Sequence, residues 1–186
     1  MQTNTELKTI HARRLDRHSL LQGLADELLK GIDAIAQIDD ETFRRSANGT
    51  GSVGEQFRHN LDVLNCLLNG LKLGRIDYAK RERNPRIEID REFAANKFRE
   101  VIERLRDSSE KELPRIIMVR SETDPSIWLP SSVAREVEFV HSHTVHHHAL
   151  ISEKLAGFGM NSIENFGVAS STLEFWKSEK IAAKPA

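Results

Sequence analysis

The sequence predicts an all-α protein built from four amphipathic helices, and two observations lead to this prediction. Apolar residues recur at intervals of three and four positions over about residues 16–38, 52–73, 91–108 and 131–156. Polar segments with glycine or proline separate these four stretches. The chain has 186 residues, of which 39% are hydrophobic and 30% charged, so it is long enough to bury a core. We expect a single domain over residues 1–176.

The first helix, about residues 16–38, carries a stripe of leucines and isoleucines. The second begins at Ser52, because a serine followed three residues later by Glu55 is the pattern of a capping box. This helix ends near Gly74, and its apolar residues cover a wide arc. We therefore expect it to be well buried, with His59 pointing into the protein or its mouth.

Residues 75–90 are too polar, and too broken by Pro85, for a core helix, so we expect a long crossover to the third helix. The charged side chains of this crossover have two interpretations, a solvated loop of ion pairs or a set of substrate contacts. Asp90 is a suitable N-cap for the third helix. Residues 115–120 form a short β-like run, and the sequence does not identify its partner strand.

Either Ser131 or Ser132 can cap the fourth helix. After this helix, apolar residues over 163–176 predict a segment that docks on the helices. We expect residues 1–15 to be a frayed lead-in and residues 177–186 to be a disordered tail.

Composition excludes several classes of function. The net charge of −1 provides no basic field, so we expect no nucleic-acid partner. No run approaches the roughly 20 apolar residues of a membrane span, and the polar N-terminus lacks the apolar core of a signal peptide. The single cysteine, Cys66, excludes an internal disulfide, and its leucine neighbours predict an inert buried thiol. These features predict a cytoplasmic protein.

Five of the eight histidines lie within residues 141–148, inside the fourth helix. Only His143 and His147 are spaced by four residues, which places them about 40° apart on the helical wheel and one turn apart along it. His146 lies on the flank of this pair, and His148 lies far round the wheel. The pair is either half of a metal site or partly buried polar packing.

A third ligand would have to come from another helix, and His59 is the best candidate. Catalytic metal sites commonly use three protein ligands and keep one open position, and imidazole nitrogen suits zinc and similar ions. Glu55 and Asp62 flank His59, and either would hydrogen-bond its distal nitrogen or pair with surface cations. The candidates for a general base or proton carrier share only their nearness to these histidines: Glu55, Asp62, Glu136, Glu138 and His146. No spacing singles one of them out.

Two motifs resemble those of the DinB-like superfamily, which is named for DNA-damage-inducible proteins of bacteria. Ser52-Val-Gly-Glu-Gln-Phe-Arg-His59 is similar to the second-helix motif of the family, and Ser142-His-Thr-Val-His-His147 to its fourth-helix motif. Three shorter segments resemble one bacterial branch: Ile76-Asp-Tyr78, Ile87-Glu-Ile-Asp90 and Phe166-Gly-Val-Ala-Ser-Ser-Thr-Leu173. The resemblance covers roughly residues 16–157.

The resemblance implies an up-down-down-up four-helix bundle with a long crossover between helices two and three. It implies that His59, His143 and His147 are metal ligands, because they match the three ligand positions of the family. One departure is visible: many members follow the last ligand with Arg-Gly-Gln, where this chain has His148-Ala149-Leu150. Many members form homodimers, and relatives include metal-dependent thiol S-transferases that act with bacillithiol or mycothiol.

Two hypotheses about function follow. The first is a metal-dependent enzyme, a thiol S-transferase or a hydrolase, acting on a small thiol or another small molecule. The second is a non-catalytic, metal-stabilised helical bundle that binds a small ligand or a protein partner. An open metal position favours the enzyme, and a closed one favours the structural role. Zinc or nickel suits ligation by histidine alone, and manganese is a further candidate.

Overall fold

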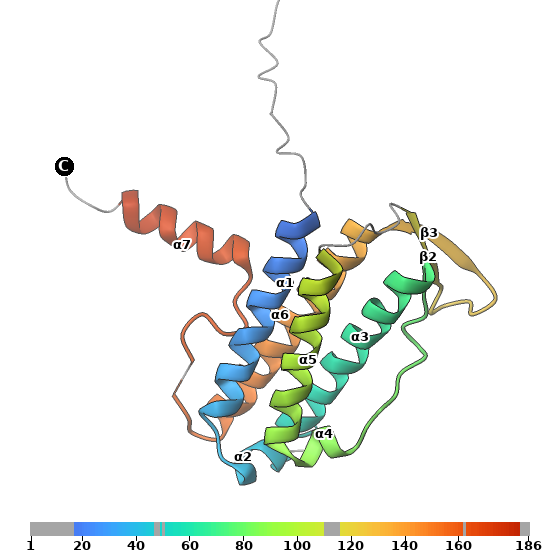
Figure 1. Cartoon of the computed structure of the whole chain (residues 1–186). Coiled ribbons are helices and arrows are strands. Elements are labelled where there is room, and N and C mark those ends of the chain that lie inside the picture. Colours follow the sequence, from blue (N-terminus) through green and yellow to red (C-terminus); the bar gives the residue numbers. More distant parts are fainter. Residues whose placement is uncertain (1–16, 47–48, 50, 110–115, 162, 183–186) are drawn as a thin grey trace, which may run out of the picture.

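We describe the chain from a computed structural model, which places residues 17–46, 49, 51–109, 116–161 and 163–182 (Figure 1). The predicted lead-in at 1–15 lies outside these residues. Four long helices dominate the structure: α1 (Arg17–Ala36), α3 (Val53–Leu73), α5 (Arg91–Ser109) and α6 (Val133–Gly157). Three further helices are shorter: α2 (Asp40–Arg44), α4 (Arg86–Ile89) and α7 (Ser170–Ala182).

The apolar stripes of the long helices meet in one core. Helix α1 packs against α5 and α6, and α3 packs against the same two helices. At the centre, the ring of Phe57 on α3 stacks on Phe43 of α2, with 6.0 Å between centroids, and meets the edge of Phe98 on α5 at 5.6 Å. Because this core includes α3 and α6, the histidines of these two helices lie at a rigid helix–helix contact.

Local sequence signals start and stop the helices. Ser52 and Glu55 form a capping box, and Gly74 ends α3 in the left-handed conformation with φ of 70°. The Asp90 carboxylate accepts a hydrogen bond from the backbone N–H three residues on, at 2.9 Å, and so caps α5. Of the two candidate serines, Ser132 caps α6.

The prediction of a mainly helical fold is confirmed, and the described residues also include a small sheet that is larger than the expected β-like run. Its three strands follow one another in the order β1 (Arg75–Ile76), β2 (Ile116–Arg120) and β3 (Trp128–Ser132). Strand β1 pairs with β2 in parallel, and β3 pairs with β2 antiparallel. The β-like run near residues 115–120 is confirmed as β2. Its partner strands could not be predicted, because β1 has only two residues and β3 is an edge strand that contains Pro130.

The chain between α3 and α5 is a long crossover that begins with β1 and ends with α4 (Figure 1). It returns to the start of α3, where the backbone carbonyl of Glu88 lies directly against Gly54. The crossover is also fixed at Asp77, whose carboxylate accepts a hydrogen bond from Arg120 of β2 at 2.8 Å. The segment between these two anchors therefore lies along α3, beside His59.

The C-terminal segment corrects two predictions. Helix α7 continues to Ala182, so residues 177–182 are helical rather than part of a disordered tail. Alanine, lysine and glutamate in this stretch are good helix formers, which explains the helix. Phe166 docks on the bundle as expected, but Phe175 and Trp176 are 59% and 48% exposed, and α7 extends away from the long helices (Figure 1). In the described part of the chain, no helix combines the length and the apolar character that crossing a bilayer requires.

Candidate metal centre

Three histidine side chains from two helices converge at the contact of α3 and α6. His59 comes from α3, and His143 and His147 come from α6. The Nε2 atom of His143 lies 3.3 Å from Nε2 of His59 and 3.2 Å from Nε2 of His147. One nitrogen from each ring forms a group whose members all lie within 4.8 Å of one another. The structure thus brings together the three residues that the sequence singled out.

Two of the three spacings between these nitrogens suit a tetrahedral metal ion. Zinc–imidazole bonds of about 2.0–2.1 Å at tetrahedral angles separate neighbouring ligand nitrogens by roughly 3.3 Å. The two Nε2–Nε2 distances to His143, 3.3 and 3.2 Å, agree with this value. The three-histidine group could therefore hold a metal ion.

A buried polar contact holds α3 and α6 in register beside the histidines. The hydroxyl of Thr144, next to His143, lies 3.1 Å from Oδ1 of Asn60, which is next to His59. The same hydroxyl lies 2.8 Å from the backbone carbonyl of Val140. Thr144 and Asn60 are both fully buried, so this contact is shielded from water. It fixes the relative height of the two helices and therefore the distance between His59 and His143.

Gln56 sets the tautomer of His147. Its side-chain oxygen lies 2.8 Å from Nδ1 of His147, and an amide oxygen only accepts hydrogen bonds. Nδ1 of His147 therefore carries the proton, and Nε2 keeps its lone pair facing the other histidines. Gln56 is not among the predicted site residues, because carboxylates rather than amides were expected to contact the ligand histidines. The available signal was its place on α3, three residues before His59.

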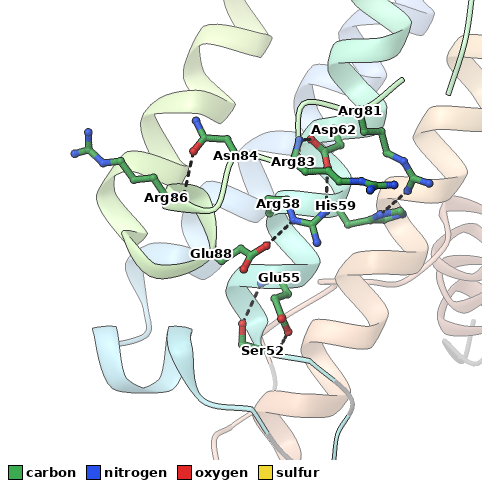
Figure 2. A network of polar contacts seen from close by, with 10 residues as sticks. All are labelled: Ser52, Glu55, Arg58, His59, Asp62, Arg81, Arg83, Asn84, Arg86 and Glu88. Carbon is green, nitrogen blue, oxygen red and sulfur yellow. Dashed lines mark hydrogen bonds and ion pairs between the residues drawn. The ribbon is translucent and has the colours of Figure 1, made fainter. Parts of the chain in front are cut away.

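His59 has the opposite tautomer. Nη1 of Arg81, on the crossover, lies 3.1 Å from Nδ1 of His59, and Figure 2 shows the guanidinium directed at the ring. Arginine only donates hydrogen bonds, so Nδ1 of His59 accepts and the proton lies on Nε2. A neutral His59 that used Nε2 as a metal ligand would need its proton on Nδ1. Arg81 and a metal ion are therefore alternative partners of His59 in its present pose.

The environment keeps the three imidazoles neutral, which is the form that binds metal. Burial, together with the charge of the neighbouring histidines, lowers the pKa of His143 from 6.5 to about 4 and that of His147 to about 3. The pKa of His59 is lowered by burial and then by the positive charge of Arg81. Near pH 7 protons therefore offer little competition for the ring nitrogens.

These pKa values predict that the metal-free protein loses stability on acidification. Between pH 6.5 and about 4, His143 and His147 are protonated in the unfolded chain but stay neutral in the folded chain. Stability is therefore full above pH 6.5 and falls as the pH decreases, by up to about 1.4 kcal/mol per pH unit for each such histidine. Urea unfolding of chelator-treated protein at pH 7.5 and pH 5 measures the slope. Substitution of both residues by asparagine should flatten it, and an equally steep slope in that variant would contradict the assignment.

Three of the predicted base candidates are engaged in structural contacts. Glu55 is committed to the capping box with Ser52, at the start of α3. Asp62 accepts hydrogen bonds at 3.0 Å from the side chain of Arg58 and from a backbone N–H of the crossover (Figure 2). Glu136 accepts from the Tyr78 hydroxyl at 2.9 Å and from a serine hydroxyl at 2.6 Å. These carboxylates hold elements together. Asp62 pairs with a cation, Arg58, as its simpler interpretation supposed, whereas Glu55 closes the capping box.

The other two candidates are exposed. Glu138 lines a cavity of about 390 Å³ on the opposite face of α6, together with His141, so it does not face the three histidines. The ring of His146 lies 5.4 Å from that of His147, between centroids. His146 is therefore the one predicted candidate that is exposed and adjacent to the centre. Cys66 takes no part, because burial raises the pKa of its thiol to about 11.

Comparison with protein families places this centre in a known context. The model of the DinB superfamily matches residues 16–151, which include all three histidines. The chain belongs to the DinB superfamily. No curated protein and no solved structure matches it significantly. The match ends inside α6, so α7 lies outside the part of the chain that the superfamily model covers.

His148, which directly follows His147 and departs from the DinB pattern, has a structural role of its own. His148 is fully buried, and its Nδ1 lies 2.8 Å from the carboxylate of Glu27 on α1. Its ring also stacks on Phe166, with 4.4 Å between centroids. Gly31 leaves space for this ring, since a methyl group added there would lie 2.9 Å from Nε2 of His148. His148 thus ties α6 to α1 and to the C-terminal segment, away from the three-histidine group.

Proposed function

We propose that this DinB-superfamily protein binds one divalent metal ion through His59, His143 and His147, and that it is a metal-dependent thiol S-transferase or hydrolase. The observation that carries the proposal is the convergence of three histidine nitrogens within 4.8 Å of one another, two of whose spacings, 3.3 and 3.2 Å, match tetrahedral ligation. Zinc or nickel is the expected ion, and manganese is the next candidate. Three neutral ligands leave the charge of the ion intact, which lowers the pKa of a bound water or stabilises a thiolate.

The protein residues around the centre have distinct roles in this proposal. Gln56 holds His147 with its Nε2 lone pair directed at the centre. The ring of Phe139 lies 6.1 Å from that of His143 and 5.3 Å from that of Tyr78, so it forms an apolar wall on one side. His146 is exposed beside His147 and is the residue placed to carry a proton to solvent.

The first test is metal content and metal-dependent thiol chemistry. Protein purified without an affinity tag or chelator should contain about one divalent ion per chain. The metal-loaded protein should accelerate the conjugation of a small thiol to an electrophilic dye or the hydrolysis of an activated ester. Chelation should remove this activity, and adding the ion back should restore it. Activity that persisted without metal would contradict the proposed mechanism.

The hydrogen bonds of the predicted general bases favour a second, non-catalytic function. Glu55, Asp62 and Glu136 are all committed to hydrogen bonds within the fold. A non-catalytic protein, in which the ion joins α3 to α6 and a small ligand or protein partner binds elsewhere, would have no use for a free base. In that case the ion should raise the melting temperature, but no thiol or exchangeable water should reach it.

Three finer features belong to the same proposal. We infer an up-down-down-up bundle from the DinB resemblance and from the crossover that returns to the start of α3. A homodimer and a cytoplasmic location stay predictions, which gel filtration and cell fractionation would test.

A further inference from the structure

The crossover places one arginine without a carboxylate partner at the candidate metal centre. Arg58 pairs with Asp62 and Glu88, at 3.0 and 2.8 Å, and Arg86 pairs with Asp90 at 2.9 Å. Arg81 makes no ion pair with the carboxylates that the structure describes. Its Nε atom is buried and has no hydrogen-bond partner among the described residues, and its Nη1 atom lies 3.1 Å from Nδ1 of His59. Figure 2 shows Arg58 beside Asp62 and Glu88, and Arg81 directed at the ring of His59.

The contact between Arg81 and His59 is incompatible with metal ligation through Nε2 of His59. A neutral ligand of that kind presents an N–H at Nδ1, where Arg81 also presents an N–H. A bound cation adds repulsion between two positive charges. Loading of the ion would therefore release the guanidinium from the ring, while the anchors of the crossover keep it near the centre.

A guanidinium beside a dication is an anion-binding arrangement. Its planar fork matches a carboxylate, with two parallel N–H donors. We propose that Arg81 is the residue that recognises the substrate, and that the small thiol acting at this centre carries a carboxylate. This inference rests on the proposed metal centre and adds the charge of the substrate. Arg81 is thus a partner of His59 in the metal-free protein and a partner of the substrate in the loaded protein.

The test uses thiol binding to the cobalt-loaded protein, which is read from the thiolate-to-cobalt absorption band and does not require turnover. Thioglycolate, which carries a carboxylate, is compared with the neutral β-mercaptoethanol. In Arg81→Met the affinity for thioglycolate should fall by about 10- to 100-fold, the value of a hydrogen bond between charged groups. The affinity for β-mercaptoethanol should stay within about twofold of the wild type, because that thiol offers the arginine no charge.

Two further variants separate recognition from general electrostatics. Lys80→Met removes the same charge from the exposed neighbouring residue and should leave both affinities unchanged. Arg81→Lys should recover part of the thioglycolate affinity, because lysine keeps the charge but loses the fork. Retained binding of β-mercaptoethanol by Arg81→Met shows that this variant is folded.

The possible outcomes distinguish a failure of the metal centre from a failure of the proposed role of Arg81. If cobalt does not bind, the proposed metal centre fails, and the role of Arg81 fails with it. If cobalt binds but neither thiol does, the metal centre stands, but the thiol-transferase function and the role of Arg81 both fail. If both thiols bind the wild type and thioglycolate binds Arg81→Met equally well, only the role of Arg81 is overturned. An equal loss of thioglycolate affinity in Lys80→Met would also overturn it, because the effect would then come from overall charge.

Discussion

Replacing His143 with alanine is expected to reduce the bound metal from about one ion per chain to almost none, while the fold persists. His143 is the central member of the cluster, because its Nε2 is within 3.3 Å of the Nε2 atoms of both other histidines. Its loss leaves two imidazoles on different helices. Structural zinc sites with four ligands bind with about 10–16 kcal/mol, so one ligand contributes roughly 3–4 kcal/mol, or about 100- to 1,000-fold in affinity.

The matched control for this experiment is His141→Ala. His141 lies on the same helix but lines the cavity on its opposite face, so its removal should leave the metal content unchanged. Metal analysis after gel filtration gives the stoichiometry, and a competition titration with a zinc indicator gives the affinity. Full metal content in His143→Ala would show that the ion binds without His143 and would contradict the proposed centre. The metal-free proteins should both show helical circular dichroism, because neither side chain belongs to the apolar core.

The positions of the long helices could be predicted because their apolar stripes repeat with the helical period. The expected stretch at 52–73 corresponds to α3, Val53–Leu73, since Ser52 and Gly74 carry local start and stop signals. The sheet could not be predicted in the same way. Strand β1 is too short to show an alternation of apolar and polar residues, and β3 contains Pro130. Neither sequence is therefore recognisable as a strand, and only their pairing with β2 in the fold identifies them.

The candidate site shows the same division between local and tertiary information. The spacing of His143 and His147 follows from the helical repeat alone. The choice of His59 needs α3 to pack on α6, which the DinB resemblance implied and no local pattern states. Gln56 and Arg81 could not be assigned, because their partners lie 91 and 22 residues away in the sequence. Such contacts depend on the register of packed elements, which composition and periodicity do not specify.

Substituting Gly54 by alanine is expected to destabilise the protein by about 3 kcal/mol or more, the upper end for overpacking a close contact. A methyl group there would lie 2.1 Å from the backbone carbonyl of Glu88 and 2.7 Å from the ring of Phe43. The carbonyl belongs to α4, so no change of side-chain rotamer relieves the clash. Either α4 must move off α3 or the first turn of α3 must unwind.

The control is the same substitution at Gly23, in the middle of α1. No atom lies within 4 Å of a methyl group added there, so Gly23→Ala should stabilise the protein by about 0.5–1 kcal/mol through helix propensity alone. Urea unfolding of both variants measures the difference. Equal stability of the wild type and Gly54→Ala would mean that α4 separates from α3 without cost.

Gly54→Ala also tests whether the contact between α4 and α3 matters for the metal centre. Arg81 reaches His59 because the crossover is fixed between Asp77 and the contact of Glu88 with Gly54. If alanine displaces α4, the crossover is released at one end, while the three histidines stay on α3 and α6. We therefore expect Gly54→Ala to keep its cobalt site at temperatures where it is folded, but to lose preference for thioglycolate over β-mercaptoethanol. Loss of the cobalt site together with that preference would instead show that the first turn of α3, and with it Gln56 and His59, has unwound.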